Sequence, residues 1–234
     1  MDKITRRLLH TSDLHLQSVH DLSFIDFKAM LTVVDRTNPD LVVIAGDLFD
    51  HHRIKEDMIE AVVENLERLK QPVVILPGNH DCLAPESPYL RTRHWEQATN
   101  IHIFRLPAGE TLHFDDLGIV LWGKPVLSHS EDIMPLAGIP GRNGHNSWHI
   151  AVAHGLYTSG DGAPERSYRI THEDIVHSGW DYVALGHMNL FQCICNGPVT
   201  ACYSGSPAIS GGVAIVDLCE KKGISVRQSA LNGT

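Results

Sequence analysis

Aspartate, histidine and asparagine recur in five short groups along the first 190 residues. Each group directly follows an apolar run. One such group is weak evidence, because an aspartate after a glycine is usually a turn or cap residue. Five groups at equivalent places indicate a shared partner, and a metal cluster is the simplest partner for groups that are costly to bury alone. The groups are Asp13-Leu14-His15, Gly46-Asp47-Leu48-Phe49-Asp50, Gly78-Asn79-His80-Asp81, His154-Gly155 and Gly186-His187.

Strands and helices must bring these groups together. Unbroken apolar runs predict strands at residues 41–45 and 73–76, and a short strand is expected at residues 7–11. Apolar residues at helical spacing predict helices at 22–36 and 56–70. Buried strands separated by helices indicate a βαβαβ unit with a mostly parallel sheet. Ligands bind at the carboxyl edge of such sheets, where the polar groups stand.

The second half of the chain predicts another sheet. Short strands are expected at residues 101–104, 118–122, 150–153 and 182–185. From residue 191 to 227 the pattern is strand–turn–strand, with turns at Asn196-Gly197-Pro198 and Gly211-Gly212, which suggests an antiparallel run closing that sheet. Two sheets with helices outside fit a layered α/β sandwich. Composition shows no break, so we expect one domain over residues 1–234.

Composition excludes several classes of protein. The net charge of −9 disfavours a broad basic surface for nucleic acid. No apolar run approaches the ~20 residues of a membrane span, and the N-terminus does not read as a signal peptide. The five cysteines lack zinc-finger spacing; Cys193 and Cys195 could meet, but free thiols in a reducing cytoplasm are expected. The four scattered tryptophans favour core packing over base stacking.

The five groups, in this order, resemble the motifs of the calcineurin-like metallophosphoesterases over residues ~8 to ~190. The resemblance implies a four-layer α-β-β-α sandwich of two mixed sheets flanked by helices. It also implies two divalent metals bridged by a carboxylate and a hydroxide. Asp13, His15 and Asp47 would hold the first metal, with Asp47 bridging, and Asn79, His154 and His187 would complete the second. Such mixed oxygen and imidazole donors suit Mn²⁺, our preferred metal, or Fe or Zn²⁺, rather than Ca²⁺.

Further residues receive roles from the same resemblance. His80 would be the general acid that protonates the leaving oxygen, and Asp50 would orient its imidazole, unless Asp50 caps the helix at 56–70. Arg53 either contacts a substrate phosphate or is a surface arginine. Asp81 is expected to support its loop, and His10 to be a packed histidine.

The branch of the family is indicated by local segments. The segments 10–16, 46–50 and 181–187, followed by Tyr203-Ser204-Gly205-Ser206-Pro207, resemble the SbcD-type DNA repair exonucleases. This implies a phosphodiesterase or nuclease, although no separate DNA-capping domain is expected. A phosphate ester is the expected substrate, nucleic acid is one candidate, and no membrane partner is expected. A small-molecule phosphoesterase for cyclic nucleotides or phosphomonoesters, and a catalytically weakened binding domain, remain open.

The weakened-domain alternative comes from Asn189. The family pattern is Gly-His-x-His, and Asn189 takes the place of the last histidine. In an extended segment residues 187 and 189 point to the same side, so Asn189 would still face the metals. Its amide oxygen is a weaker donor than imidazole for transition metals, so we hypothesise a tight second site and a weak first site.

Overall fold

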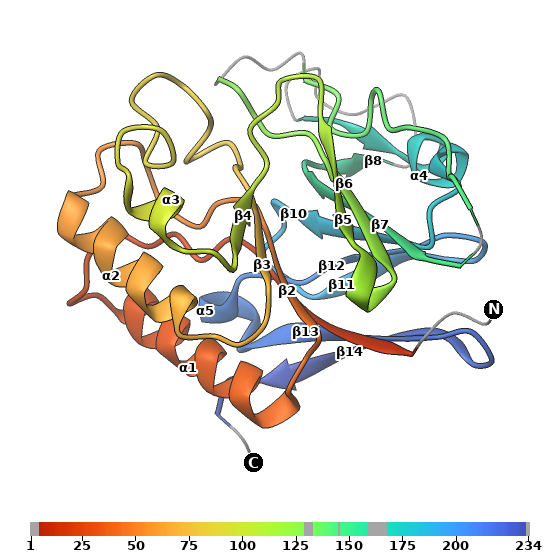
Figure 1. Cartoon of the computed structure of the whole chain (residues 1–234), viewed down its shortest axis with the longest axis horizontal. Helices are drawn as coiled ribbons and strands as arrows, with labels where there is room; N and C mark the ends of the chain where they lie inside the picture. The colour runs from red at the N-terminus through yellow and green to blue at the C-terminus, as the bar shows by residue number, and fades with distance from the viewer. Residues whose placement is uncertain (1–4, 129–132, 145, 159–167, 233–234) are drawn as a thin grey trace.

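The computed structural model describes residues 5–128, 133–144, 146–158 and 168–232. Two six-stranded mixed sheets stack on each other, and helices lie on their outer faces (Figure 1). The first sheet contains, in spatial order, β14 (Gly223–Ala230), β13 (Gly212–Cys219), β1 (Arg6–Thr11), β2 (Leu41–Ala45), β3 (Val73–Leu76) and β4 (Ile101–Ile103). The second contains β11 (Gln192–Asn196), β12 (Thr200–Tyr203), β10 (Tyr182–Gly186), β7 (Trp148–His154), β6 (Ile119–Gly123) and β5 (Glu110–Phe114).

The first half of the chain folds as its apolar pattern predicts. β1, β2, β3 and β4 are parallel neighbours. Helix α1 (Leu22–Thr37) connects β1 to β2, and α2 (Glu56–Glu67) connects β2 to β3. The predicted second helix extends three residues too far, because the chain must become extended ahead of Pro72, and a residue before proline disfavours helix.

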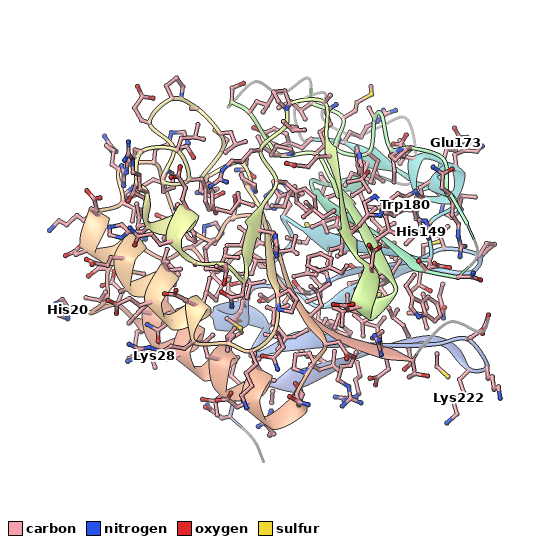
Figure 2. All side chains as sticks on the ribbon, viewed as in Figure 1. His20, Lys28, His149, Glu173, Trp180 and Lys222 are labelled. Carbon is pink, nitrogen blue, oxygen red and sulfur yellow. A yellow bond between two sulfur atoms is a disulfide. The ribbon has the colours of Figure 1, made fainter. Side chains whose placement is uncertain are left out.

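Three apolar clusters separate four layers, so the predicted four-layer arrangement is confirmed. One cluster lies between α1, α2 and the first sheet, one between the two sheets, and one on the outer face of the second sheet beside α4 (His172–Ser178). Every tryptophan belongs to one of these clusters, as predicted; Figure 2 shows Trp180 next to His149, with 5.2 Å between the ring centroids. The smaller elements are α3 (His94–Gln97), α5 (Pro207–Ser210), the 3₁₀ turn Asp115–Leu117 and the strand pair β8 (Tyr157–Thr158) and β9 (Ile170–Thr171).

The prediction for the C-terminal part is wrong in its topology. Only β11 and β12 join the second sheet, where β12 runs parallel to β10. β13 and β14 return to the first sheet, with β13 antiparallel to β1. Gly211 ends the short helix α5 instead of forming a strand-to-strand turn. The reason is that the first five residues of β13 are all buried, as the centre of a sheet requires, and β1 has a free side for it.

The expectation of free thiols is wrong for two cysteines. Cys193 and Cys202 form a disulfide between β11 and β12, where the strand register places them opposite each other. Cys82, Cys195 and Cys219 are free. The inference of a reducing compartment therefore loses part of its basis. Among the described residues, no helix combines the length and the apolar character that crossing a membrane requires.

Candidate metal centre

The five predicted groups meet at one place, from both sheets. Asp13, Asp47 and Asn79 follow β1, β2 and β3 of the first sheet, whereas His154 ends β7 and His187 follows β10 of the second sheet. The backbone N–H of His187 donates to Oδ2 of Asp13 at 3.0 Å, which joins the sheets directly. The carboxyl ends of the two sheets therefore form a single site, as the positions of the motifs predict.

Six side chains of the predicted groups form one connected set of contacts that includes Asp47. Nε2 of His154 lies 3.3 Å from Oδ2 of Asp47 and 2.9 Å from Oδ1 of Asn79. Nδ1 of His187 lies 3.1 Å from the same oxygen of Asn79. On the other side, Nε2 of His15 lies 3.9 Å from both Oδ1 of Asp13 and Oδ2 of Asp47. Asp47 thus lies between imidazoles from both sheets, His15 of the first and His154 of the second.

The backbone of the site is unusual, which explains the motif glycines. Among the described residues, four of the six non-glycine residues with positive φ are Asp13, His15, Asp47 and His187, at 54°, 48°, 52° and 99°. A Cβ at Gly46, where φ is 95°, would lie 2.0 Å from Nδ1 of His154. Glycine is required there because the backbone approaches the imidazole so closely.

Burial and charge set the protonation of the cluster. Burial raises the pKa of Asp13, opposed by the charge of His154 and reinforced by Asp47. Burial also acts to raise the pKa of Asp47, but attraction to His154 and a hydrogen bond from it hold that pKa well below its usual range. Burial lowers the pKa of His154, yet Asp47 outweighs it and raises the pKa to about 9. Burial, with repulsion from His154, lowers the pKa of His187 to about 4.

The donor set fits divalent transition metals. Ligand atoms of Asp13, Asp47 and His154, three fully buried side chains, lie within 4.8 Å of one another. Nδ1 of His154 lies 2.9 Å from the carbonyl oxygen of Ala45, which can only accept, so Nδ1 carries the proton and Nε2 faces the carboxylates. Metal-binding histidines are usually oriented in this way. A cation could replace the second proton of His154, since buried carboxylates need a positive partner.

Beside the cluster is an open cavity of about 530 Å³, lined by Asp50, His51, His52, Arg53, Asn79, His80 and Glu86. Nδ1 of His80 lies 2.8 Å from the backbone carbonyl oxygen of Asp50 and 3.8 Å from its carboxylate. The helix-cap alternative for Asp50 is wrong, because α2 begins after Lys55. Arg53 is exposed at the cavity, and the structure brings it to the site without a contact to the cluster.

Asp81 and His10 have the structural roles expected of them. The fully buried carboxylate of Asp81 accepts hydrogen bonds from the N–H groups of Phe49 and Gly78, at 3.0 and 2.8 Å, and from the Tyr89 hydroxyl at 2.5 Å. It thereby ties the loops after β2 and β3 together, while burial raises the pKa of Asp81 to about 6. His10 is fully buried, and its Nδ1 lies 2.9 Å from the Tyr182 hydroxyl.

Asn189 follows a bend in the chain instead of continuing strand β10. The premise of an extended segment is wrong, because φ of His187 is 99° and the chain bends there. Asn189 is exposed, and its backbone carbonyl accepts a hydrogen bond from Ser206. Within the described residues, its side chain makes no hydrogen bond. The geometry therefore gives no support to Asn189 as a donor to the first group.

Sequence reasoning missed two residues that hold the site loops. Nε2 of Gln17 donates to Oδ2 of Asp50 at 2.9 Å. The guanidinium of Arg91 donates to the carbonyl oxygens of His52, at 2.7 Å, and Ile54. The local sequence does not mark Gln17, because its partner Asp50 lies 33 residues away. Nothing in the local sequence marks Arg91, because its partners are backbone atoms 37–39 residues away.

Comparisons with known proteins agree with this geometry. The chain is 26% identical over 220 residues to the uncharacterised metallophosphoesterase YhaO of Bacillus subtilis, covering 85% of this chain and 52% of that protein. It is also 26% identical over 247 residues to one of the subunits of the nuclease SbcCD of Bacillus subtilis, covering 86% of this chain and 61% of that protein. It thus spans about half of the length of the curated relatives it matches.

The fold has a close solved counterpart. TT1561 of Thermus thermophilus superposes with a TM-score of 0.66 at 12% identity, over 98% of this chain and 100% of that one. At that identity the likeness concerns the fold alone. The family model described as calcineurin-like phosphoesterase matches residues 6–203, most of the chain. The chain therefore belongs to the calcineurin-like phosphoesterase family.

Proposed function

We propose that this protein is a metal-dependent phosphoesterase that hydrolyses phosphodiesters, with a nucleic acid strand as the first candidate substrate. One observation carries the proposal: the carboxylate of Asp47 lies near imidazoles from both sheets, His15 and His154, beside an open cavity that His80 lines. A shared carboxylate is what two neighbouring metal ions require, and paired ions are the usual catalysts of phosphoester hydrolysis.

Named residues would hold each ion. Asp13, His15 and Asp47 would bind the first ion, and Asp47, Asn79, His154 and His187 the second. When bound, such ions supply Lewis acidity to a phosphoryl oxygen and lower the pKa of water. Mn²⁺ is the preferred metal for mixed carboxylate, amide and imidazole donors, with Fe and Zn²⁺ as alternatives.

The residues that line the cavity would handle the substrate. Nδ1 of His80 donates to the carbonyl oxygen of Asp50, so the imidazolium form would carry its second proton on Nε2 and would give that proton to the leaving oxygen. Arg53 would hold a non-reacting phosphate oxygen, since a guanidinium pairs with phosphate through two parallel hydrogen bonds. Both side chains are exposed to the cavity, which supports their access to substrate.

A small-molecule phosphodiester is the second candidate substrate, and the cavity favours it. A volume of about 530 Å³ falls within the range of roughly 300–1,000 Å³ that small-ligand pockets occupy. The net charge of −9 also gives no broad basic surface for duplex DNA. Nucleic acid remains the first candidate because of the similarity to a nuclease component along most of the chain.

A substrate panel tests the proposal. The protein would be stripped of metal, reloaded with Mn²⁺, and assayed on bis-p-nitrophenyl phosphate, p-nitrophenyl phosphate and single-stranded DNA. We expect Mn²⁺-dependent cleavage of the first, and a fall of about 10²–10⁴-fold in kcat for His80→Asn. His113→Asn, an exposed histidine on β5, is the matched control and should not change kcat. Hydrolysis confined to p-nitrophenyl phosphate, or none with metal bound, would refute a phosphodiesterase.

A further inference from the structure

We infer that Asp50 is a positioning residue for His15, in addition to its contact with His80. Its carboxylate would fix the imidazole of His15 toward Asp13 and Asp47, while its backbone carbonyl holds His80. The inference rests on the proposed function, because His15 is one of the side chains proposed to bind the first ion. The carboxylate oxygen of Asp50 would thus serve the imidazole of His15, and the backbone carbonyl oxygen of Asp50 serves the imidazole of His80.

The contact with His80 uses the backbone of Asp50. Nδ1 of His80 lies 2.8 Å from the carbonyl oxygen and 3.8 Å from Oδ1. A carbonyl oxygen can only accept, so the single proton on Nδ1 points to it. The carboxylate is therefore not required to orient His80 and can serve a second group.

The second group is His15. Its Nδ1 is buried and has no hydrogen-bond partner among the described residues. Oδ1 of Asp50 lies 3.3 Å from it, but the two atoms do not form a hydrogen bond in this conformation. Buried polar atoms are nearly always paired, so a small rotation of the ring or of the carboxylate is expected to complete this bond. Nδ1 would then carry the proton, and Nε2 would be the ligand atom.

Two further contacts make the arrangement specific. Nε2 of Gln17 donates to Oδ2 of Asp50 at 2.9 Å, which holds the carboxylate with Oδ1 toward the ring. At the opposite end of the ring, Nε2 of His15 is 3.9 Å from Asp13 and 3.9 Å from Asp47. The chain Gln17–Asp50–His15 thus leads into the first donor group. In metal sites, a carboxylate behind a histidine fixes the tautomer and the ring orientation.

Metal affinity measured apart from catalysis tests the inference. Asp50→Ala removes the carboxylate and keeps the backbone carbonyl that contacts His80. Mn²⁺ binding would be measured by calorimetry on metal-stripped protein, in a His80→Asn background, so that no effect can pass through His80. We expect one of two sites to weaken about 10–100-fold, the usual effect of losing such a partner. Asp50→Asn, which keeps an acceptor oxygen, should recover part of that affinity.

Controls separate positioning from general damage. Asp35→Ala, at an exposed position of α1, should leave Mn²⁺ affinity unchanged. In a His15→Asn background, Asp50→Ala should cause no further loss, because coupled residues are not additive. Three results would overturn this inference and leave the proposed function standing. The first is unchanged Mn²⁺ affinity in Asp50→Ala, and the second is an equal loss of Mn²⁺ affinity from Asp50→Ala when His15 is already replaced. The third is a third bound Mn²⁺ that Asp50→Ala abolishes. Absence of Mn²⁺ binding by the unsubstituted protein would overturn the proposed function as well.

Discussion

The buried His10 should make the fold sensitive to mild acid. It is fully buried in β1, and burial lowers its pKa from 6.5 to about 3. In the unfolded chain His10 therefore binds a proton below pH 6.5, whereas in the folded protein it stays unprotonated down to about pH 3. Since the unfolded state binds more protons in this window, stability is present above pH 6.5 and lost as the pH falls. At pH 5 the loss from this one residue is about 2 kcal/mol.

Urea unfolding at pH 7.5, 6 and 5 measures this loss. Other buried groups also titrate; burial lowers the pKa of His149, and attraction to Asp47 raises that of His154. The comparison is therefore with His10→Asn, whose side-chain oxygen can still accept from the Tyr182 hydroxyl but cannot take up a proton. The variant should be less stable at pH 7.5 because of the smaller side chain. Its stability should fall about 2 kcal/mol less between pH 7.5 and 5 than that of the unsubstituted protein.

Parallel loss of stability in the two proteins would refute this reasoning. It would mean that His10 takes up its proton in the folded state, through a partner that offsets burial. Both proteins would be measured in EDTA, so that protonation of the metal-binding histidines does not appear as a change in ligand binding.

Three further results are expected. Gly46→Ala should lower the free energy of unfolding in urea by at least about 2 kcal/mol and weaken Mn²⁺ binding, because the added Cβ would meet the imidazole of His154. The control is Gly223→Ala, where φ is 78° and the added Cβ meets open space, so only backbone strain is introduced. This control should lower the free energy of unfolding by about 1–2 kcal/mol and leave Mn²⁺ affinity unchanged. Replacing Cys193 and Cys202 by serine should lower the free energy of unfolding by about 2–3 kcal/mol, because a bridge between residues nine positions apart restricts the unfolded chain by about that amount. The unsubstituted protein in reductant should lose the same amount if the disulfide is the cause. Asn189→His should change Mn²⁺ affinity by less than about twofold, and a tightened site would show that residue 189 reaches the first ion despite the bend at His187.

Local pattern predicts the parallel half of the fold well. β2 and β3 begin and end where predicted. Each is a run of four or five aliphatic residues between turn signals, a pattern typical of a strand in the centre of a sheet. The five donor groups were also predictable, since the carboxyl ends of such strands must lie at one edge. These predictions use information that lies within about ten residues of each element.

The failures in topology and in side-chain pairing depend on contacts between distant segments. The place of β13 beside β1 joins residues more than 200 positions apart, such as Arg6 and Leu218. The disulfide depends on the register of β11 on β12, which puts Cys202, rather than Cys195, opposite Cys193. The carboxylate of Asp50 lies nearer to His15 than to His80 for the same reason, since the loops after β1 and β2 are cross-linked by the tertiary fold.

The strained backbone of the site explains why the extended path expected for residues 187–189 does not form. A non-glycine residue in a sparsely populated backbone region costs about 1–3 kcal/mol and persists only where its surroundings fix it. Here the N–H groups of Asp13 and His15 donate to the carbonyls of Gly46 and Asp47, and the N–H of His187 donates to Asp13. Each of these bonds holds a residue with positive φ in place. The segment after His187 therefore bends instead of continuing β10 in an extended path.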